Sequence, residues 1–301
     1  MTDPIIRQLT FEDLDDAFRL STVAGWNQRI DDWRMLLRLA PAGAFAALSD
    51  VRAASIIGTA IGIDYGGFAW IAMMLVDPAY RGRGVGRRLL EAAMDAVPSH
   101  LAIRLDATPL GRPLYRRYGF EDEAALSRHV IDQARLAEPR VARTRPARFP
   151  VRPLSGTDMA IVIEQDRATF GGTRGAVLEW AFRSAPQYAY TVRSDSTERG
   201  PIHYCLGRRG CLFDQIGPVV AGDDDIAHAL VSAALGAAGD RRVAVDVFDS
   251  RRAFAAAMQA EGFVVERSFV RMCRPTDSTA GAPAVGHRHS CEFAILGPEF
   301  A

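Results

Sequence analysis

The stretch Leu75–Leu90, LVDPAYRGRGVGRRLL, leads from an apolar strand through a glycine- and arginine-rich turn into a helix. Its glycines, Gly82, Gly84 and Gly86, let the backbone approach a ligand because no Cβ stands in the way. The N–H groups of such a turn point into one concavity, and the following helix adds the positive end of its dipole. The stretch therefore predicts a binding site for phosphate groups.

Two other phosphate-binding loops fit this turn less well. Positive charge around it comes from Arg81, Arg83, Arg87 and Arg88. A P-loop is excluded because it needs a lysine, and all 36 basic residues of the chain are arginine. A dinucleotide-binding fingerprint would have its third glycine at Arg87, although Asp106 stands about twenty residues further on, where an acidic ribose ligand is expected.

Two motifs together resemble the GNAT superfamily of N-acetyltransferases. The spacing Arg81-x-x-Gly84-x-Gly86, after Val76-x-Pro78, is similar to the acetyl-CoA loop of that family. The segment Leu114–Phe120, LYRRYGF, resembles the family's next helix, which carries a tyrosine and ends in Gly-Phe. The resemblance covers residues 68–120 and implies acetyl-CoA as cosubstrate.

The resemblance also implies which residues hold acetyl-CoA. Main-chain groups around Leu75 and Val76 would pair with the pantetheine arm as a substitute strand, which requires the next strand to splay away. The diphosphate would lie on the turn, whose expected binding residues are Arg81, Gly82, Arg83, Gly84, Val85, Gly86 and Arg87.

Composition indicates a soluble globular protein. The 301 residues suffice for one large or two ordinary domains, and 49% of them are hydrophobic. A formal net charge of zero gives no sign of a nucleic-acid or membrane partner. The chain shows neither a leader nor a membrane span, so we expect it in the cytoplasm. The four cysteines match no zinc spacing, and no metal is expected.

The chain contains two related halves. The segment Ile6–Asp13, IRQLTFED, is echoed by Val151–Asp158, VRPLSGTD. Further along, Pro78 pairs with Pro218, and Gly119-Phe120 pairs with Gly262-Phe263, in the same order and at nearly the same offset. The prediction is a mixed α/β fold of two tandem GNAT-like domains, each a central mixed β-sheet flanked by helices, with a splayed strand pair.

The domain boundaries follow from this duplication. We expect a cofactor-binding domain at 1–136, a proline-containing linker at 137–150, a second domain at 151–275 and a tail at 276–301 whose apolar end docks on a domain. In the first half, helices are predicted at 11–24, 30–39 and before Gly119, and strands at 44–48, 56–63, 68–76 and 103–106.

Acetyl transfer needs a positioned acyl carbon, a stabilised oxyanion and an acid for the departing thiolate. The resemblance implies Tyr115 as that acid. Tyr118, three residues further along the helix, is the competing candidate, and either tyrosine can instead be a packing residue. Thr108 departs from the family pattern, in which an asparagine is common, so one coenzyme A contact is in doubt.

The remaining candidates concern the acceptor. Asp106, at the end of a predicted strand, is the candidate general base or the partner of the acceptor's ammonium group, and equally suits a structural role. Trp26 and Asn27 lie between two predicted helices, a region that lines the acceptor site in relatives. Trp26 is equally compatible with a place in the core.

The second half lacks the same chemistry. Aligning Pro78 with Pro218 places Ala221–Asp225, AGDDD, opposite Arg81–Val85, and carboxylates there repel a diphosphate or cap a helix. Tyr115 aligns with Met258. The chain thus resembles bacterial tandem GNAT proteins with an active first and a degenerate second domain. The expected activity is acetyl transfer to a small amine, and the alternative is a non-catalytic protein that senses acyl-CoA or binds a partner.

Overall fold

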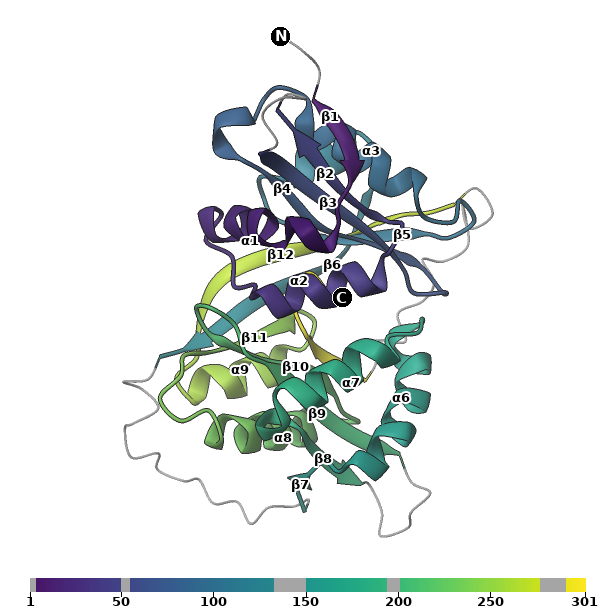
Figure 1. Ribbon diagram of the computed structural model, residues 1–301. Coiled ribbons are helices and arrows are strands. Elements are labelled where there is room, and N and C mark those ends of the chain that lie inside the picture. The colour runs from purple at the N-terminus through teal and green to yellow at the C-terminus, as the bar shows by residue number, and fades with distance from the viewer. Residues whose placement is uncertain (1–3, 50–54, 133–149, 194–200, 277–290) are drawn as a thin grey trace. The chain divides into compact units, whose positions relative to one another are not determined.

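The computed structural model describes residues 4–49, 55–132, 150–193, 201–276 and 291–301 (Figure 1). The chain divides into two compact units. Unit 1 consists of Met1–Asp122, Arg271–Ala284 and Pro298–Ala301, and unit 2 of Glu123–Val270 and Val285–Gly297. These units differ from the contiguous halves expected at 1–136 and 151–275, because each includes residues from the other half. Apart from Pro150, the predicted linker 137–150 lies outside the described residues.

Unit 1 is built on a mixed sheet. Its strand order is β1 (Ile5–Gln8), β2 (Ala44–Leu48), β3 (Ile56–Asp64), β4 (Ala69–Val76), β5 (Ile103–Ala107) and then β12 (Val264–Arg274), whose last residues belong to this unit. The pairs from β1 to β4 are antiparallel, and β4 pairs with β5 in parallel. The strands predicted in this half are confirmed to within one residue at either end.

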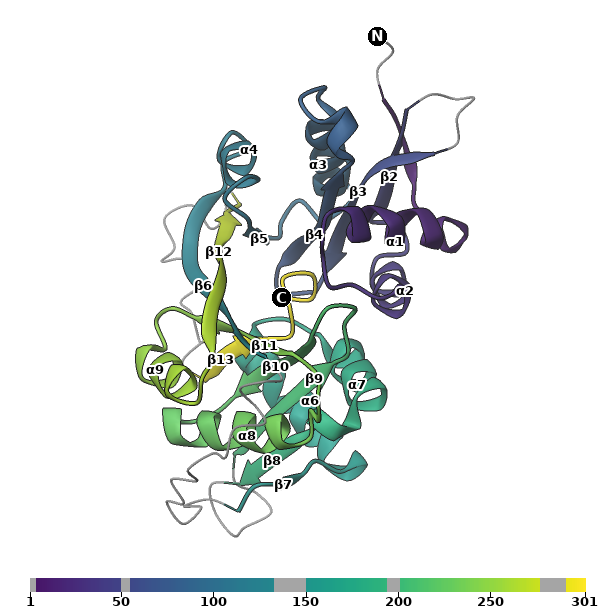
Figure 2. The same cartoon turned by 90° about the vertical axis from the view of Figure 1, so that its left-hand side faces the viewer.

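Helices cover both faces of this sheet (Figure 2). Helix α3 (Val85–Asp95) lies against β3, where a Cβ on Gly62 would be 2.5 Å from the Ala93 carbonyl oxygen. The opposite face carries α1 (Leu14–Val23) and α2 (Ile30–Leu39). A hydrogen bond of 3.2 Å from Trp33 Nε1 to Ser21 Oγ joins these two helices in the core. Glycines on β3 thus allow α3 to approach closely.

Unit 2 repeats the plan. Its strand order is β6 (Glu121–Ile131), β11 (Val243–Phe248), β13 (Glu292–Ile295), β10 (Asp214–Val220), β9 (Ile202–Arg208), β8 (Tyr190–Arg193) and β7 (Arg152–Pro153). The helices are α6 (Gly156–Phe170), α7 (Gly175–Ser184), α8 (Asp224–Gly236) and α9 (Arg252–Ala260). The tail was expected to dock on a domain, and its residues 292–295 form a strand of this sheet.

The duplication predicted from the sequence has a three-dimensional counterpart. Arg7 donates two hydrogen bonds of 2.7 Å to Asp13, and Arg152 donates two of 2.8 Å to Asp158. Both aspartates also accept from the backbone N–H three residues upstream, at the start of the first helical turn of each half. Such a capping box satisfies a helix terminus, and the matched arginines reinforce both copies.

The end of the repeat also matches. The Phe120 N–H donates to the Tyr115 carbonyl at 3.2 Å, and the Phe263 N–H donates to the Met258 carbonyl at 3.2 Å. The intervening Gly119 and Gly262 both have positive φ angles, which glycine adopts without strain. Met258 is therefore the counterpart of Tyr115, as the sequence alignment proposed.

The pairing of Pro78 with Pro218 is wrong. Pro78 follows β4 and opens a short 3₁₀ turn, whereas Pro218 lies inside β10, after a cis peptide bond and at a shift in strand register. Strand β10 runs on to Val220, so only residues 221–223 separate it from α8, compared with 77–84 between β4 and α3. Residues 221–223 therefore connect β10 to α8 without room for a turn like that at 77–84, and residues 221–225 do not match Arg81–Val85 one by one.

None of the helices within the described residues is long and apolar enough to cross a membrane. The described residues also contain no cluster of three or more metal-ligating side chains, while the histidines at 287 and 289 lie outside them.

The close approach of α3 to β3 predicts the effect of a small substitution. Gly62→Ala is expected to lower the free energy of unfolding by about 1–3 kcal/mol, because its Cβ would overlap the Ala93 backbone. Urea unfolding followed by circular dichroism measures this, with Gly156→Ala as the control, since a Cβ there meets nothing within 4 Å. Equal stability of the two variants would contradict the packing described.

Candidate functional site

Strand β4 carries a bulge where the candidate site begins. Met73 has a φ of 51°, and Thr59 and Ile61 of β3 pair with Leu75 and Ala72, so extra residues of β4 stand opposite Ala60. The Thr59 hydroxyl donates to the Met73 carbonyl at 2.8 Å, which satisfies a buried acceptor at the bulge. A bulge bends and twists a strand, and here it re-aims the second half of β4.

Strands β4 and β5 pair only at their starts. In the described part of the chain, their register is limited to Ala69 with Ile103 and Trp70 with Arg104, and no strand lies between them. Asp106 on β5 is half-buried although its side chain is fully buried, so its exposure comes from the main chain. We call this unpaired stretch the β4–β5 separation, and it matches the splayed strand pair that the sequence predicts.

Val76 directs main-chain groups into this separation. The next residue, Asp77, donates its N–H to the Ile57 carbonyl of β3 at 2.8 Å. Because successive residues of a strand present their polar groups to opposite sides, those of Val76 face away from β3. Its carbonyl accepts a hydrogen bond of 3.1 Å from Arg81 Nε. The side chain of Leu75 is buried at 4% exposure and its backbone pairs with Thr59 of β3, so the groups that face the separation are those of Val76.

The glycine-rich turn starts directly after Val76. The Asp77 carboxylate accepts from the Ala79 N–H at 3.0 Å and holds the 3₁₀ turn Pro78–Tyr80. Gly82 and Gly84 then take φ angles of 74° and 79°, a region that favours glycine. The sequence LVDPAYRGRGVG therefore folds into a turn that only glycine completes without strain.

Helix α3 begins with backbone donors that the helix itself does not use. Gly84 is the N-cap and has no side chain to cap them. The Arg88 N–H donates to the Gly84 carbonyl at 3.1 Å, which makes it the first donor with an intrahelical partner four residues back. The N–H groups of Val85, Gly86 and Arg87 precede it, and such groups at a helix start bind anions.

Charge around the turn is positive and exposed. Arg81, Arg83 and Arg87 are exposed, and the Arg83 guanidinium lies 5.3 Å from the centre of the Tyr80 ring. Arg88 is engaged elsewhere, since it donates to the Pro4 carbonyl at 2.6 Å. The arginines expected to bind phosphate are thus available at the turn, and Arg88 instead holds the N-terminal segment.

Tyr115 projects from α4 (Arg112–Arg116) and is 8% exposed. Its ring packs edge-to-face on Phe120 with centroids 5.9 Å apart. A Cβ on Gly111 would lie 2.9 Å from Tyr115 Cε2, so this glycine makes room for the ring. Burial raises the pKa of Tyr115 well above its usual value of 10.0, and the phenol stays protonated at neutral and moderately alkaline pH.

Tyr118 is placed differently from Tyr115. Its hydroxyl donates a hydrogen bond of 2.6 Å to Glu91 of α3, and this bond is the main cause that raises the pKa of Tyr118. The hydroxyl therefore joins the turn after α4 to α3. Among the described residues the Tyr115 hydroxyl has no hydrogen-bond partner, which leaves it able to donate to a ligand.

Asp106 is held in a buried ion pair. Arg271 Nε and Nη2 donate to the two oxygens of its carboxylate at 2.9 and 3.0 Å. The Arg271 guanidinium also lies 4.8 Å from the centre of the Trp70 ring. Both carboxylate oxygens are thereby engaged, which makes Asp106 less accessible as a proton acceptor. Sequence reasoning missed Arg271, because it is 165 residues away and belongs to the second half.

The expected acceptor residues lie between α1 and α2, as predicted. The Trp26 N–H donates to the Ser21 carbonyl at 2.9 Å, and the Trp26 side chain is half-buried. Asn27 is 4% exposed. Thr108 precedes α4, and its hydroxyl accepts from the Gly111 N–H at 3.3 Å, so it shapes the turn next to Tyr115.

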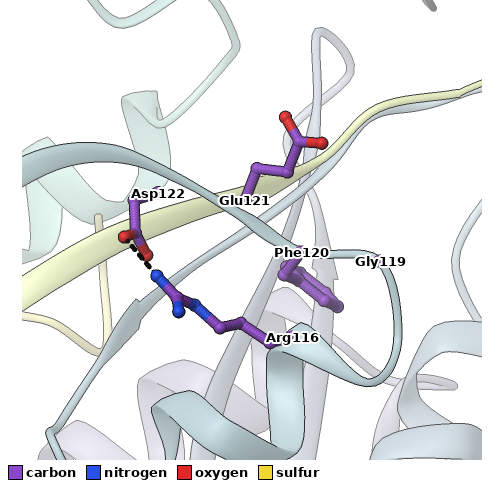
Figure 3. Close-up of a pocket in the computed structure, with 5 residues that line it drawn as sticks. All are labelled: Arg116, Gly119, Phe120, Glu121 and Asp122. Atoms are coloured by element: carbon purple, nitrogen blue, oxygen red, sulfur yellow. Dashed lines mark hydrogen bonds and ion pairs between the residues drawn. The ribbon is translucent and has the colours of Figure 1, made fainter.

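A separate depression of about 340 Å³ lies beside the end of α4 (Figure 3). It is lined by Arg116, Gly119, Phe120, Glu121 and Asp122. Arg116 donates to Asp122 at 2.9 Å, and Arg112 pairs with the same carboxylate. None of the residues expected to bind acetyl-CoA lines this depression. Arg116, which does, is already paired with Asp122.

Comparison with known proteins agrees with this geometry. Residues 42–122 match a family model described as an acetyltransferase (GNAT) domain, and residues 162–282 match another with the same description. The chain carries two GNAT acetyltransferase domains in tandem. The first match includes the bulge, the turn and α4, and the second covers most of unit 2.

The chain is similar to proteins described as acetyltransferases. The chain is 25% identical over 180 residues to an uncharacterized N-acetyltransferase, YitH, of Bacillus subtilis (strain 168), a match that covers 60% of this chain and 61% of that protein. A putative acetyltransferase from Pyrococcus horikoshii has a TM-score of 0.74 at 23% identity, over 99% of this chain and 96% of that one.

A tandem GNAT protein from the clavulanic acid biosynthesis pathway has a TM-score of 0.61 at 16% identity, over 90% of this chain and 98% of that one. At such identities the solved structures establish a common fold. The GNAT domains of this chain imply an acyl-CoA donor.

The buried ion pair predicts a large effect on stability. Asp106→Asn retains the shape of the side chain but removes the charge that faces Arg271, and we expect the free energy of unfolding to fall by about 3 kcal/mol. Chemical unfolding of the full chain measures this. Asp122→Asn is the control, because its ion pairs are exposed and its loss should be clearly smaller. Similar losses for both variants would contradict the structural role of Asp106.

Proposed function

We propose that unit 1 is an N-acetyltransferase that uses acetyl-CoA and transfers the acetyl group to the amine of a small molecule. The observation that carries this proposal is the junction at Val76, where the β4–β5 separation runs directly into the uncapped N-terminus of α3. An extended arm and a diphosphate are the two halves of one ligand, and this junction offers a place for each.

Acetyl-CoA would be held by main chain along most of its length. Main-chain groups around Leu75 and Val76, of which those of Val76 face the separation, would bind the pantetheine arm as a strand, which needs no particular side chain. The diphosphate would accept hydrogen bonds from the turn residues Arg81–Arg87, with the arginines adding charge-assisted bonds. Acetyl-CoA supplies the activated thioester, and the protein supplies its position.

The proposed chemistry is direct attack in a ternary complex. The acceptor nitrogen forms a bond to the thioester carbonyl carbon, and the carbon–sulfur bond breaks. The thiolate takes a proton from the Tyr115 hydroxyl, and the acceptor nitrogen loses one proton to a base or to water. Burial keeps the Tyr115 phenol protonated until the thiolate forms, and by raising the pKa it also makes the phenol a weaker acid.

Asp106 is the candidate general base. Both oxygens of Asp106 accept hydrogen bonds from Arg271, so Asp106 acts as the base only if water or the acceptor displaces one of them. In its ion-paired state Asp106 holds the Arg271 guanidinium next to β5. Trp26 and Asn27 are proposed to contact the acceptor from the α1–α2 connection.

Unit 2 is proposed to be the degenerate member of the pair. Its connection between β10 and α8 has no glycine-rich turn, and the Asp223 carboxylate accepts from the Ile226 N–H at 2.8 Å. This side chain thus occupies the helix terminus that unit 1 leaves to a ligand, and its negative charge opposes a diphosphate. The counterpart of Tyr115 is Met258, which has no proton to donate.

A non-catalytic sensor of acyl-CoA is the alternative. It would use the same turn and separation but would leave Tyr115 without a chemical role. Turnover with a panel of small amines discriminates between the two, because a sensor binds acetyl-CoA without releasing coenzyme A beyond the uncatalysed rate.

The turn predicts a graded response at Gly86. A Cβ there would lie 3.5 Å from Val76 Cγ2, an ordinary contact, so Gly86→Ala should fold like the parent yet bind acetyl-CoA more weakly by obstructing its approach. Gly86→Glu adds bulk and negative charge and should abolish binding. Calorimetric titration of both variants, with melting temperatures as the folding check, tests this. Parental affinity in a folded Gly86→Glu would contradict the proposed site.

The proposed role of Tyr115 as the acid predicts that kcat responds differently to substitution of Tyr115 and of Tyr118. Tyr115→Phe keeps the ring packing and should lower kcat by about 10²-fold with little change in acetyl-CoA affinity. Tyr118→Phe should be milder, because that hydroxyl already bonds Glu91. In the parent, kcat should show no loss from phenol ionisation as pH rises toward 10, since the raised pKa keeps Tyr115 protonated.

The neighbouring glycine supplies a further check on the acid. Gly111→Ala should displace the Tyr115 ring and lower kcat, but should have no added effect when Tyr115 is already Phe. Additive losses in the double variant, or unchanged turnover in Tyr115→Phe when product release is not limiting, would remove Tyr115 from the mechanism.

A further inference from the structure

Strand β13 lies between two strands of unit 2 that are parallel neighbours at their starts. Strands β10 and β11 pair only through Asp214 with Val243 and Gln215 with Ala244. Beyond these residues, β13 (Glu292–Ile295) is inserted between them and runs antiparallel to both. Figure 2 shows β13 in yellow beside β11 and β10.

This place corresponds to the β4–β5 separation of unit 1. The two matching pairs there are Ala69 with Ile103 and Trp70 with Arg104, and both β4 and β10 shift register just beyond them. In unit 1 the separation contains no strand of the described chain, whereas in unit 2 it contains β13. The same sheet position therefore contains a strand in one copy of the repeat and none of the described strands in the other.

Gly217 is the seat of β13. A Cβ on this residue would lie 2.0 Å from the Ile295 carbonyl oxygen and 2.6 Å from its carbon. Such distances exclude any side chain at position 217, so a glycine is required there for the backbone of β13 to approach β10.

The backbone of the inserted segment is bonded along its length. The Ala221 N–H donates to the Cys291 carbonyl at 2.8 Å, where β10 leads toward α8. Arg251 Nε donates to the Glu292 carbonyl at 3.2 Å, and Arg208 Nε donates to the Leu296 carbonyl at 3.4 Å. Polar main-chain groups that would otherwise be exposed in the separation are thus satisfied by the chain itself.

The side chains of β13 belong to the core of unit 2. All four residues of the strand are buried, and Phe293 packs edge-to-face on Phe254 with centroids 5.5 Å apart. The Arg251 guanidinium lies 4.2 Å from the centre of the Phe293 ring. A segment with this burial is a permanent part of the sheet rather than a loosely attached tail.

An ionic cluster fixes the start of the strand. Arg174 Nη2 donates to Glu292 at 2.9 Å and to Asp166 at 2.8 Å, and Tyr204 donates to Asp166 at 2.5 Å. The arginine and both carboxylates are at most 1% exposed. Removing one member of a buried ion pair is strongly destabilising, so position 292 requires an acidic side chain to pair with Arg174.

We propose that β13 is a built-in occupant of the acyl-CoA position of unit 2, so that the full chain binds a single acetyl-CoA, in unit 1. The strand takes the place that the pantetheine arm is proposed to take between β4 and β5, and this inference rests on the proposed function in that respect. Loss of cofactor binding in unit 2 is then a replacement of the ligand by a segment of protein.

Two measurements on the full-length protein test this proposal. Native mass spectrometry with acetyl-CoA should show a single equivalent bound, and Gly86→Glu should bind none. Hydrogen exchange should show the amides of 292–296 among the most protected of the chain, with or without acetyl-CoA. A second equivalent, binding retained by Gly86→Glu, or rapid exchange in 292–296 would each overturn the proposal. Absence of any binding would instead contradict the proposed function, while hydrogen exchange still tests β13.

A substitution at the seat supplies the matched comparison. Gly217→Ala should raise hydrogen exchange in 292–296 by at least about tenfold while the Kd for acetyl-CoA stays within about twofold. Gly236→Ala, in α8 with nothing within 4 Å of its Cβ, is the control and should leave exchange unchanged. Glu292→Gln replaces Gly217→Ala if the latter does not fold. Parental protection of 292–296 in a folded Gly217→Ala, or in Glu292→Gln where that variant replaces it, would overturn the proposal.

Discussion

Backbone polar groups inside a sheet need partners, and this requirement governs both units. Each unit contains two parallel strands that pair over two residues and then part, because a register shift re-aims one of them. The parting leaves main-chain donors and acceptors inside the sheet. Unit 2 satisfies them with its own strand, and in unit 1 the parted strands are the proposed position of an extended ligand.

Helix termini show the same division between the two units. Helix α3 starts at Gly84, which has no side chain, whereas α8 starts at Asp223, whose carboxylate bonds the Ile226 N–H. A glycine leaves the positive end of a helix dipole to an incoming anion, and an aspartate neutralises it from within. Sheet position and helix terminus thus agree, since the chain's own groups occupy both in unit 2, whereas no described strand or capping side chain occupies them in unit 1.

Local sequence was sufficient for much of unit 1. The turn 81–86 has glycines at the positions with positive φ, and the predicted helix at 30–39 and strands at 44–48 and 103–106 agree with the structure. Tyr115 and Met258 were correctly aligned because a conserved spacing to Gly-Phe links each to the same hydrogen bond. The splayed pair followed from the family resemblance, and the strand register bears it out.

Long-range features were beyond the sequence. The match of Pro78 with Pro218 failed because a proline after a strand and a cis-proline inside one look alike in a linear pattern. The apolar run Phe293–Leu296 indicates burial but not which strands these residues join. Arg271 gives no sign of its partner Asp106, since no local period connects positions so far apart. The assignments of Tyr115, Asp106, Trp26 and Asn27 to chemical roles remain predictions.

The partnership of Asp106 with Arg271 has a consequence for the order in which the protein matures. Ribosomes synthesise a chain from its N-terminus, and the first domain usually folds while the rest is still being made. Here β5 acquires its neighbour β12, and Asp106 its counter-ion, only after about nine-tenths of the residues have been synthesised. The first unit in the gene is therefore completed near the end of translation, and a nascent chain arrested midway would expose an unfinished sheet edge.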